Sequence, residues 1–348
     1  MCGITGVFAF NLVGKFNMIN VTNATMALQK RGPDFQDIYT DSWVGLGHRR
    51  LSIIDTSEAG NQPMWDEIKR FAIIFNGEIF NFKELRGDLQ SKGISFRSES
   101  DTEVLLKLFI LEREKCLTKL NGFFSFCIYD KEEQSMFLAR DRYGIKPLLY
   151  LFDEDKFLFA SEMKAMMCYG IEKTIDYASL FTYLQLNYSP APHTIFSNVK
   201  KLMPGHYLKV RSGKLDVQSY YDIEAADERG SSITYEQAKE KFKNLLETSV
   251  KRRLVSDVPL GSFLSGGIDS SIVAGLASRH KPDLHTFSIG FKDEPFFDET
   301  EYARLVAKHF NTSHTVFSLS NNDLYQHLHS ILNYLDEPFA DSSAIAVY

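Results

Sequence analysis

The second residue of this chain is a cysteine, and it directly follows the initiator methionine. Cysteine is small enough for methionine aminopeptidase to remove Met1, which would leave a thiol and a free α-amino group on one residue. An α-amino group has a pKa of about 8, so part of it is unprotonated at neutral pH and can accept the thiol proton. Because a thiolate is a good nucleophile, Cys2 is a candidate N-terminal nucleophile. The alternative is that Met1 stays and Cys2 is an ordinary small residue.

Further polar motifs follow along the first third of the chain. Arg31-Gly32-Pro33-Asp34 contains a Gly-Pro pair, which is typical of a turn. Gly47–Asp55 continues a predicted strand, and Asn76-Gly77-Glu78 ends another. Because Asn-Gly is a favoured hairpin pair, a β-turn is the alternative interpretation of Asn76-Gly77. Ser100-Asp101-Thr102-Glu103 opens a predicted helix with apolar residues at helical spacing.

The composition is that of an ordinary globular protein. The 348 residues are 44% hydrophobic and 24% charged, and this length predicts two domains. A net charge of −6 gives no electrostatic reason to bind nucleic acid. The longest apolar runs have the length of a strand and the N-terminus lacks a secretion signal, so we expect no membrane association and a cytoplasmic location. The cysteines (Cys2, Cys116, Cys127 and Cys168) show no metal-binding spacing.

The first part of the chain predicts strands and helices that do not form a βαβ series. Strands are expected at Ile4–Phe10, Trp43–His48 and Phe71–Phe75, and helices at Met18–Gln29, Phe82–Ser91 and Asp101–Arg113. Residues 123–161 then contain four strands separated by turns, which predicts an antiparallel meander. Apolar helices at both ends indicate two stacked sheets covered by helices, a four-layer αββα sandwich.

Taken in order, these motifs and Met-Cys-Gly-Ile at the N-terminus resemble those of the class II glutamine amidotransferases, the N-terminal-nucleophile (Ntn) hydrolases that use glutamine. The resemblance is greatest to the family of glutamine-hydrolysing asparagine synthetases. It covers residues 2–103 of a domain that we expect to span residues 1–215. It implies an Ntn-hydrolase fold with Cys2 as the catalytic residue.

The resemblance also assigns residues to the two charged groups of glutamine. Arg50 suits the α-carboxylate, because a guanidinium donates two parallel charge-assisted hydrogen bonds. Asp101 suits the α-ammonium group, with Glu78 as a second acceptor. Taken alone, Arg50 could equally form a surface ion pair, and Asp101 could be a helix N-cap.

Attack on the glutamine amide creates an oxyanion, and Asn76 and Gly77 can donate to it from a side chain and a backbone N–H. In the family, the backbone at Leu51, Ile53 and Ile54 lines the glutamine pocket. Asp141–Pro147 matches another motif of the family, which we interpret as a structural turn near this pocket.

The pattern changes after a polar, charged stretch at Tyr220–Ser232, which predicts an interdomain linker at residues 216–234. From Tyr235 the chain alternates between helices and strands, which predicts a parallel, doubly wound sheet over residues 235–348. The strands are expected at Leu260–Leu264, His285–Phe291 and His314–Leu319. Ligands of such sheets bind beyond the carboxyl ends of the strands.

A Gly-rich stretch, Ser265–Ser270, lies at such a position and resembles the PP-loop of ATP pyrophosphatases. Gly266 and Gly267 let backbone N–H groups approach phosphate, while Ser265 and Ser270 add hydroxyl donors. Asp269 is the candidate Mg²⁺ ligand. In the family, Leu264 and Ile289 flank the adenine of ATP. A simple turn between strand and helix is the alternative.

The resemblance implies an ATP-dependent amidotransferase that makes asparagine from aspartate and glutamine, with AMP and pyrophosphate as products. Such an enzyme requires ATP and Mg²⁺, and a homodimer is compatible with the resemblance. Ammonia would pass between two sites inside the protein. Asp336–Ser343 resembles an acidic segment that could place Mg²⁺ or the acceptor, or be a solvated loop. Synthetase domains of this family continue beyond the position of Tyr348, so the second domain is expected to be incomplete.

Two other functions are compatible with the sequence. Proteins that resemble asparagine synthetases also amidate other carboxylates, and the acceptor pocket would lie largely beyond Tyr348. A catalytically inert glutamine sensor or scaffold is the non-enzymatic alternative. The complete set of Cys2, Arg50, Asn76, Gly77 and Asp101 argues against it.

Overall fold

The computed structural model describes residues 1–223 and 233–340. The chain divides into two compact units, of which the first comprises Met1–Ile223 together with Asp336–Ala340. The second takes the remaining described residues, 233–335. Strand β12, Lys214–Ser219, crosses position 215, where the first domain was expected to end. The linker predicted at residues 216–234 lies partly outside the described residues.

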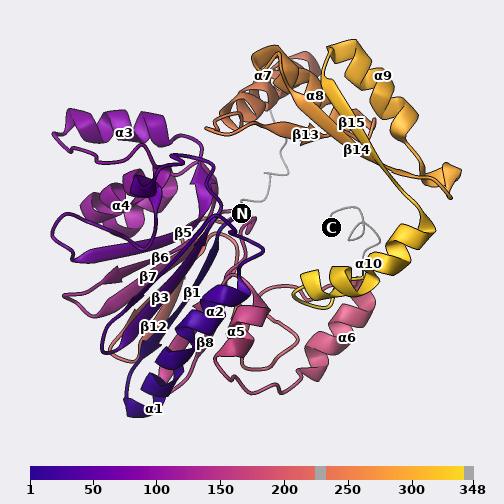
Figure 1. Cartoon of the computed structure of the whole chain (residues 1–348). Coiled ribbons are helices and arrows are strands. Elements are labelled where there is room, and N and C mark those ends of the chain that lie inside the picture. Colours follow the sequence, from indigo (N-terminus) through magenta and orange to yellow (C-terminus); the bar gives the residue numbers. More distant parts are fainter. Residues whose placement is uncertain (224–232, 341–348) are drawn as a thin grey trace. The chain divides into compact units, whose positions relative to one another are not determined.

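The first unit contains two six-stranded sheets (Figure 1). One sheet has the strand order β10-β8-β9-β1-β3-β2, and the other has the order β12-β11-β7-β6-β5-β4. The strands are β1 (Gly3–Ala9), β2 (Phe35–Thr40), β3 (Val44–Arg50), β4 (Met64–Trp65), β5 (Phe71–Ile79), β6 (Gly122–Asp130), β7 (Ser135–Arg140), β8 (Leu149–Phe152), β9 (Lys156–Ala160), β10 (Lys200–Lys201), β11 (His206–Arg211) and β12. The helices are α1 (Leu12–Lys15), α2 (Val21–Ala27), α3 (Phe82–Ser91), α4 (Asp101–Glu112), α5 (Met163–Cys168) and α6 (Tyr177–Leu186).

Alternation of side chains along the strands creates one core between the sheets and another on an outer face. Ile4 and Leu46 from the first sheet pack against Ile74 and Leu138 from the second, and all four are fully buried. Val7 faces the opposite way and packs under α2 and α5. Helices α3 and α4 pack together, and α4 contacts β5 of the second sheet. The predicted αββα sandwich is therefore confirmed.

Residues 123–161 do not form one meander, because their two hairpins belong to different sheets. Strands β6 and β7 pair within the second sheet, whereas β8 and β9 pair within the first. The turn at Asp141–Pro147 carries the chain from one sheet to the other. The β-turn considered at Asn76-Gly77 is also wrong, since both residues lie inside β5 and pair with β6.

The second unit is built on a parallel sheet of three described strands, β13 (Gly261–Phe263), β14 (His285–Phe291) and β15 (Ser313–Leu319). Its helices are α7 (Tyr235–Arg252), α8 (Ile268–His280), α9 (Thr300–Phe310) and α10 (Asn321–Tyr334). A small core holds it together, in which Leu264 packs with residues of α8 and α9. The predicted alternation of parallel strands and helices is confirmed. No helix within residues 1–223 and 233–340 has both the length and the apolar character that crossing a bilayer requires.

Candidate functional site

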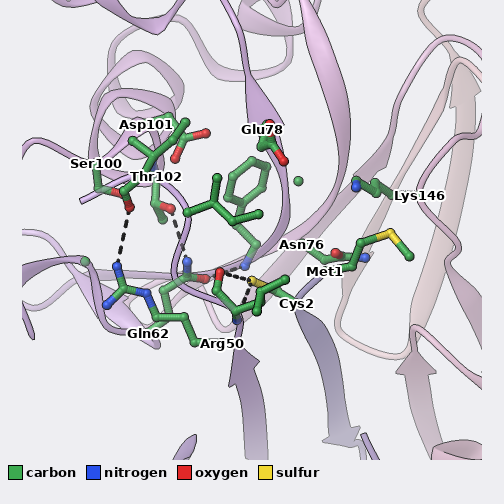
Figure 2. A pocket seen from close by; sticks show the side chains of 16 residues that line it. Met1, Cys2, Arg50, Gln62, Asn76, Glu78, Ser100, Asp101, Thr102 and Lys146 are labelled. Carbon is green, nitrogen blue, oxygen red and sulfur yellow. Dashed lines mark hydrogen bonds between the residues drawn. The ribbon is translucent and has the colours of Figure 1, made fainter. Parts of the chain in front are cut away.

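One pocket in the first unit brings together every residue predicted to handle glutamine (Figure 2). They come from the N-terminus, the end of β3 and the loop after it, strand β5 and the start of α4. The nine residues are Cys2, Arg50, Leu51, Ile53, Ile54, Asn76, Gly77, Glu78 and Asp101. Met1, Gln62, Thr102 and Lys146 also line the pocket, and sequence reasoning did not select them.

Cys2 lies just before β1, half-buried at the wall of this pocket. Its Sγ accepts a hydrogen bond from the backbone N–H of Leu51 at 3.4 Å. Burial raises the pKa of the Cys2 thiol, and this N–H opposes the effect by stabilising the thiolate. The amine of Met1 is affected in the reverse direction, because burial lowers its pKa. A thiol and an amine therefore share one partly dehydrated environment.

Arg31 holds Cys2 in position, although the sequence indicated only a turn there. Its Nε donates to the backbone carbonyl of Cys2 at 2.8 Å, and its Nη1 forms an ion pair with Glu162 at 2.9 Å. The following Gly32 is required by close packing, since a Cβ there would come within 2.3 Å of the Arg49 carbonyl carbon. Glu162 lies 131 positions further along the chain, so no local signal could have revealed this pair.

Asn76 and Gly77 lie side by side in β5, at the same pocket as the thiol. The Asn76 side chain is fully buried, and its Oδ1 has no hydrogen-bond partner among the described residues. Its Nδ2 makes one long contact, 3.5 Å to Ser125 Oγ. An amide with so little internal bonding is available to a ligand. Gly77 cannot be replaced without movement, because a Cβ would lie 2.3 Å from the Phe123 carbonyl oxygen.

Asp101 is the first residue of α4, and its carboxylate faces the pocket rather than capping the helix. The N-cap is Ser100, whose hydroxyl accepts the N–H of Thr102 at 3.1 Å, so the N-cap alternative for Asp101 is wrong. Burial raises the pKa of Asp101 to about 7, and an N–H from Ile79 at 2.9 Å opposes the shift. Burial also raises the pKa of Glu78. A bound ammonium group would stabilise both carboxylates in their charged form.

Arg50 is buried, and its guanidinium already binds the loop that follows β3. Nη1 donates to the carbonyl of Ser57 and to Asn61 Oδ1, both at 2.7 Å. Nη2 donates to the carbonyls of Asp55 and Ile54. The surface ion pair considered for Arg50 is therefore wrong. A substrate carboxylate would have to replace some of these acceptors.

The Gly-rich loop of the second unit joins β13 to α8 and is organised by its own residues. Ser265 Oγ and Ser270 Oγ lie 3.0 Å apart, and Gly267 N–H donates to Ser265 Oγ at 3.2 Å. Gly266 has φ +86°, and a Cβ there would lie 2.5 Å from that of Tyr302, so glycine is needed. The hydroxyls of exposed Ser265 and half-buried Ser270 and the N-terminus of α8 give this loop the donors that a phosphate requires.

The remaining ATP-site candidates occupy this end of the sheet. Asp269 is exposed in the first turn of α8. Leu264 directly follows β13, and Ile289 lies in the neighbouring strand β14. The described residues contain no group of three His, Cys, Asp or Glu side chains arranged to hold a metal ion. The assignment of Asp269 to Mg²⁺ stays a prediction.

The described part of the acidic segment, Asp336–Ala340, belongs to the first unit. The Asp336 carboxylate accepts the N–H groups of Met163 and Lys164 at the start of α5, the latter at 2.9 Å. Glu337 forms an ion pair with Lys201 at 2.7 Å. Burial raises the pKa of Asp336 to about 6. The solvated loop considered for this segment is wrong for Asp336 and Glu337, whereas Phe339 and Ala340 are exposed, and residues 341–343 lie outside the described part.

The αββα sandwich of the first unit, with Cys2 at its pocket, is the fold of the Ntn-type glutamine amidotransferases. Residues 1–221 match the family model of the glutamine amidotransferase domain, and residues 241–348 match that of asparagine synthase. The chain is 36% identical over 353 aligned positions to asparagine synthetase [glutamine-hydrolyzing] 1 of Bacillus subtilis. This alignment covers 100% of the chain and 55% of the relative, so the chain spans about half the length of that protein.

A protein of Methanocaldococcus jannaschii, provisionally named asparagine synthetase [glutamine-hydrolyzing] 2, is 35% identical over 100% of this chain and 70% of its own length. The chain therefore belongs to the family of glutamine-hydrolysing asparagine synthetases. A third relative is the amidase chry2 of Gibberella zeae, which is 36% identical over 72% of this chain and 37% of its own length.

Proposed function

We propose that the first unit hydrolyses glutamine at Cys2 after removal of Met1. The observation that supports this most directly is the single pocket that contains the thiol, two candidate oxyanion donors and two carboxylates suited to an ammonium group. Residues that act on one glutamine molecule have to lie around one cavity, and these do although they are distant in sequence. The N-terminal thiol then serves as nucleophile and the α-amine beside it as base.

In the proposed reaction the amine takes the proton of the thiol, and the sulfur attacks the side-chain amide carbon of glutamine. The oxyanion that forms is stabilised by the side chain of Asn76 and the backbone N–H of Gly77; one such donor is typically worth about 3–4 kcal/mol. The amine then returns its proton to the leaving nitrogen, the C–N bond of the tetrahedral intermediate breaks, and ammonia departs to leave a thioester. Water hydrolyses the thioester to glutamate and restores the thiol.

We further propose that the ammonia is used to amidate aspartate in the protein to which the second unit belongs. The β-carboxylate of aspartate would attack the α-phosphate of ATP, releasing pyrophosphate and forming β-aspartyl-AMP. Ammonia would then displace AMP and give asparagine. The hydroxyls of exposed Ser265 and half-buried Ser270 suit the phosphates. The phosphate oxygens of ATP and the Asp269 carboxylate are ligands that Mg²⁺ accepts. Bound Mg²⁺ would neutralise part of the phosphate charge.

The test combines N-terminal mass spectrometry with an assay of glutamate release. We expect a chain that begins at Cys2 and hydrolyses glutamine, and we expect Cys2→Ala to lose this activity while retaining its circular dichroism spectrum. Retention of Met1 in an active chain would contradict the role of the free amine. A Cys2→Ala chain as active as the parent would exclude the nucleophile.

A second candidate differs only in the acceptor that receives ammonia. The similarity to an amidase, which covers 72% of this chain, favours a family in which the final substrate varies. Screening carboxylates by pyrophosphate release would separate the two functions. Aspartate-dependent release supports asparagine synthesis, whereas release with another carboxylate and none with aspartate supports the second candidate.

A further inference from the structure

The turn between β7 and β8, Arg140–Pro147, is held by more hydrogen bonds than a simple crossover needs. The buried Asp141 carboxylate accepts four backbone N–H groups at 3.0–3.2 Å. These four belong to Phe124, Tyr143, Ile145 and Lys146. One of them comes from β6, so the turn is fixed both to itself and to the second sheet.

Arg140 completes this framework from the other side of the turn. Its guanidinium donates to the carbonyls of Gly144 at 2.7 Å and Lys146 at 2.8 Å, and also to that of Leu202. Gly144 has φ +66°, and a Cβ there would lie 2.9 Å from Pro204. Both the amide and the carbonyl of Lys146 are therefore bonded to fixed side chains. The backbone of this one residue is held in place from two directions.

The Lys146 side chain lines the pocket that contains Cys2 and Glu78, and only 7% of the residue is exposed (Figure 2). No described carboxylate forms a salt bridge with it. A buried ammonium group without an ion pair is costly, and such groups concentrate at functional sites. Burial lowers the pKa of Lys146, while the charge of Glu78 opposes this effect.

Several other charged groups face this part of the pocket and influence the protonation of the thiol and the amine. Glu78 on β5 favours protonation of the Met1 amine, and Asp101 on α4 favours protonation of the Cys2 thiol. Arg50 at the end of β3 opposes protonation of the thiol, and Arg31 after α2 opposes protonation of the Met1 amine. Asp141 also acts on Lys146, but its oxygens are satisfied by backbone N–H groups. Arg50 and Arg31 are occupied by carbonyls and Glu162. Among the described side chains that line the pocket, Lys146 is therefore the cation whose charge is neither neutralised by an ion pair nor committed to loop carbonyls.

We infer that Lys146 is a positioning residue for the nucleophile: its ammonium group keeps the N-terminal amine unprotonated and favours the thiolate of Cys2. This inference rests on the proposed glutaminase function. A nearby positive charge disfavours a protonated amine and stabilises a thiolate, so both groups shift in the direction that attack requires. The fixed turn supplies this charge at a constant position.

The test compares Lys146→Met with Lys146→Arg, which restores the charge, and with Lys131→Met in the exposed β6–β7 turn as control. The rate of Cys2 alkylation by iodoacetamide is measured from pH 6 to 10, without glutamine, by mass spectrometry of the N-terminal peptide. The pH dependence of kcat/KM for glutamine hydrolysis is measured in parallel. We expect both profiles of Lys146→Met to move to higher pH by about one unit, Lys146→Arg to restore most of the shift, and Lys131→Met to show none.

The alkylation profile separates this inference from the proposed function. An unchanged profile in Lys146→Met would overturn the role of Lys146, even if hydrolysis fell. A shifted profile in a chain that never hydrolyses glutamine would instead contradict the glutaminase proposal and leave the charge effect supported. A higher KM with no shift in either profile would assign Lys146 to substrate binding and overturn the inference. If Lys146→Met does not fold, Lys146→Gln tests the same loss of charge with a polar side chain.

Discussion

The pocket around Cys2 and the Gly-rich loop before α8 are assembled in opposite ways. The pocket draws its residues from separate parts of the chain, and most of those that carry charge or hydrogen-bonding groups are buried. The loop carries its donors within Ser265–Ser270, where the two serine hydroxyls are exposed or half-buried and bond to one another and to the backbone of the loop. The first site is a preformed cavity, and the second is a local backbone conformation.

This difference follows from what each ligand needs. Attack on an amide requires a nucleophile, a base and oxyanion donors within a fraction of an ångström of fixed positions, and only a packed core provides that rigidity. Phosphate needs several N–H and O–H donors and a favourable helix dipole, which six consecutive residues can supply. Substitutions should therefore affect the two sites independently, and the following predictions test that separation.

The largest effect is expected for Cys2→Ala. Without the thiol no thioester can form, so glutamine hydrolysis should fall by a factor of about 10³ or more. Equilibrium binding of ATP in the presence of Mg²⁺ should be unchanged, because the loop at Ser265–Ser270 has no residue in common with the pocket. The measurements are glutamate release and calorimetric titration of ATP. A parallel loss of ATP binding would show that the two sites are not independent.

A smaller effect is expected for Asn76→Ala, which removes one oxyanion donor and leaves the thiol. Typical losses for such a donor are about 10²- to 10³-fold in kcat. The KM for glutamine should change little, because the donor acts on charge that develops only in the transition state. Steady-state kinetics distinguish the two parameters. A rise in KM at constant kcat would instead assign Asn76 to ground-state binding.

Asp269→Asn tests the other side of the comparison. The carboxylate is exposed at the start of α8 and makes no contribution to the pocket. We expect ATP binding with Mg²⁺ to weaken by about tenfold or more, since a hard cation loses a charged oxygen ligand. Glutamine hydrolysis serves as the internal control and should stay within twofold of the parent. Equal ATP affinity for parent and variant would remove Asp269 from the ATP site.

The smallest predicted effect is a pH dependence carried by Asp101. Its pKa in the folded chain is raised, to about 7, mainly by burial. The ionised form needed for the glutamine ammonium group therefore increases as pH rises through 7, and the KM for glutamine should fall several-fold between pH 6 and 8. Asp101→Asn should have a higher KM that varies less with pH.

The same raised pKa affects the stability of the fold, which should fall as pH rises, whereas glutamine binding should improve. A carboxyl with a raised folded pKa contributes stability at pH values below the unfolded pKa, and that contribution is lost as pH rises through the folded pKa. We therefore expect Asp101→Asn to reduce the loss of unfolding free energy between pH 4 and 7. Urea titrations at several pH values measure this change. If the unfolding free energy changed with pH equally in parent and variant, the raised pKa of Asp101 would be contradicted.

The residues that could be identified from the sequence were those in motifs whose order matches a known family. Cys2, Asn76 and Asp101 were predicted in this way, and the structure places all three at one pocket. Arg31 and Lys146 also lie in motifs of that family, but the sequence indicated only turns there. Their roles depend on contacts with Cys2 and Glu162, and on the pocket wall, that form only in the folded chain. The division of β6–β9 between two sheets was missed for the same reason. Adjacent hairpins have the same local pattern whether or not they share a sheet.

The guanidinium of Arg50 donates to the carbonyls of Ser57, Asp55 and Ile54 and to the side chain of Asn61. When the α-carboxylate of glutamine binds, Arg50 exchanges hydrogen bonds to the loop for hydrogen bonds to the substrate. The net free energy of this contact is therefore only the difference between the old and the new hydrogen bonds. Affinity for glutamine should thus remain modest despite a charged, buried anchor. Hydrogen exchange in the segment 54–61 would then report occupancy directly, as its amides respond to each displaced contact.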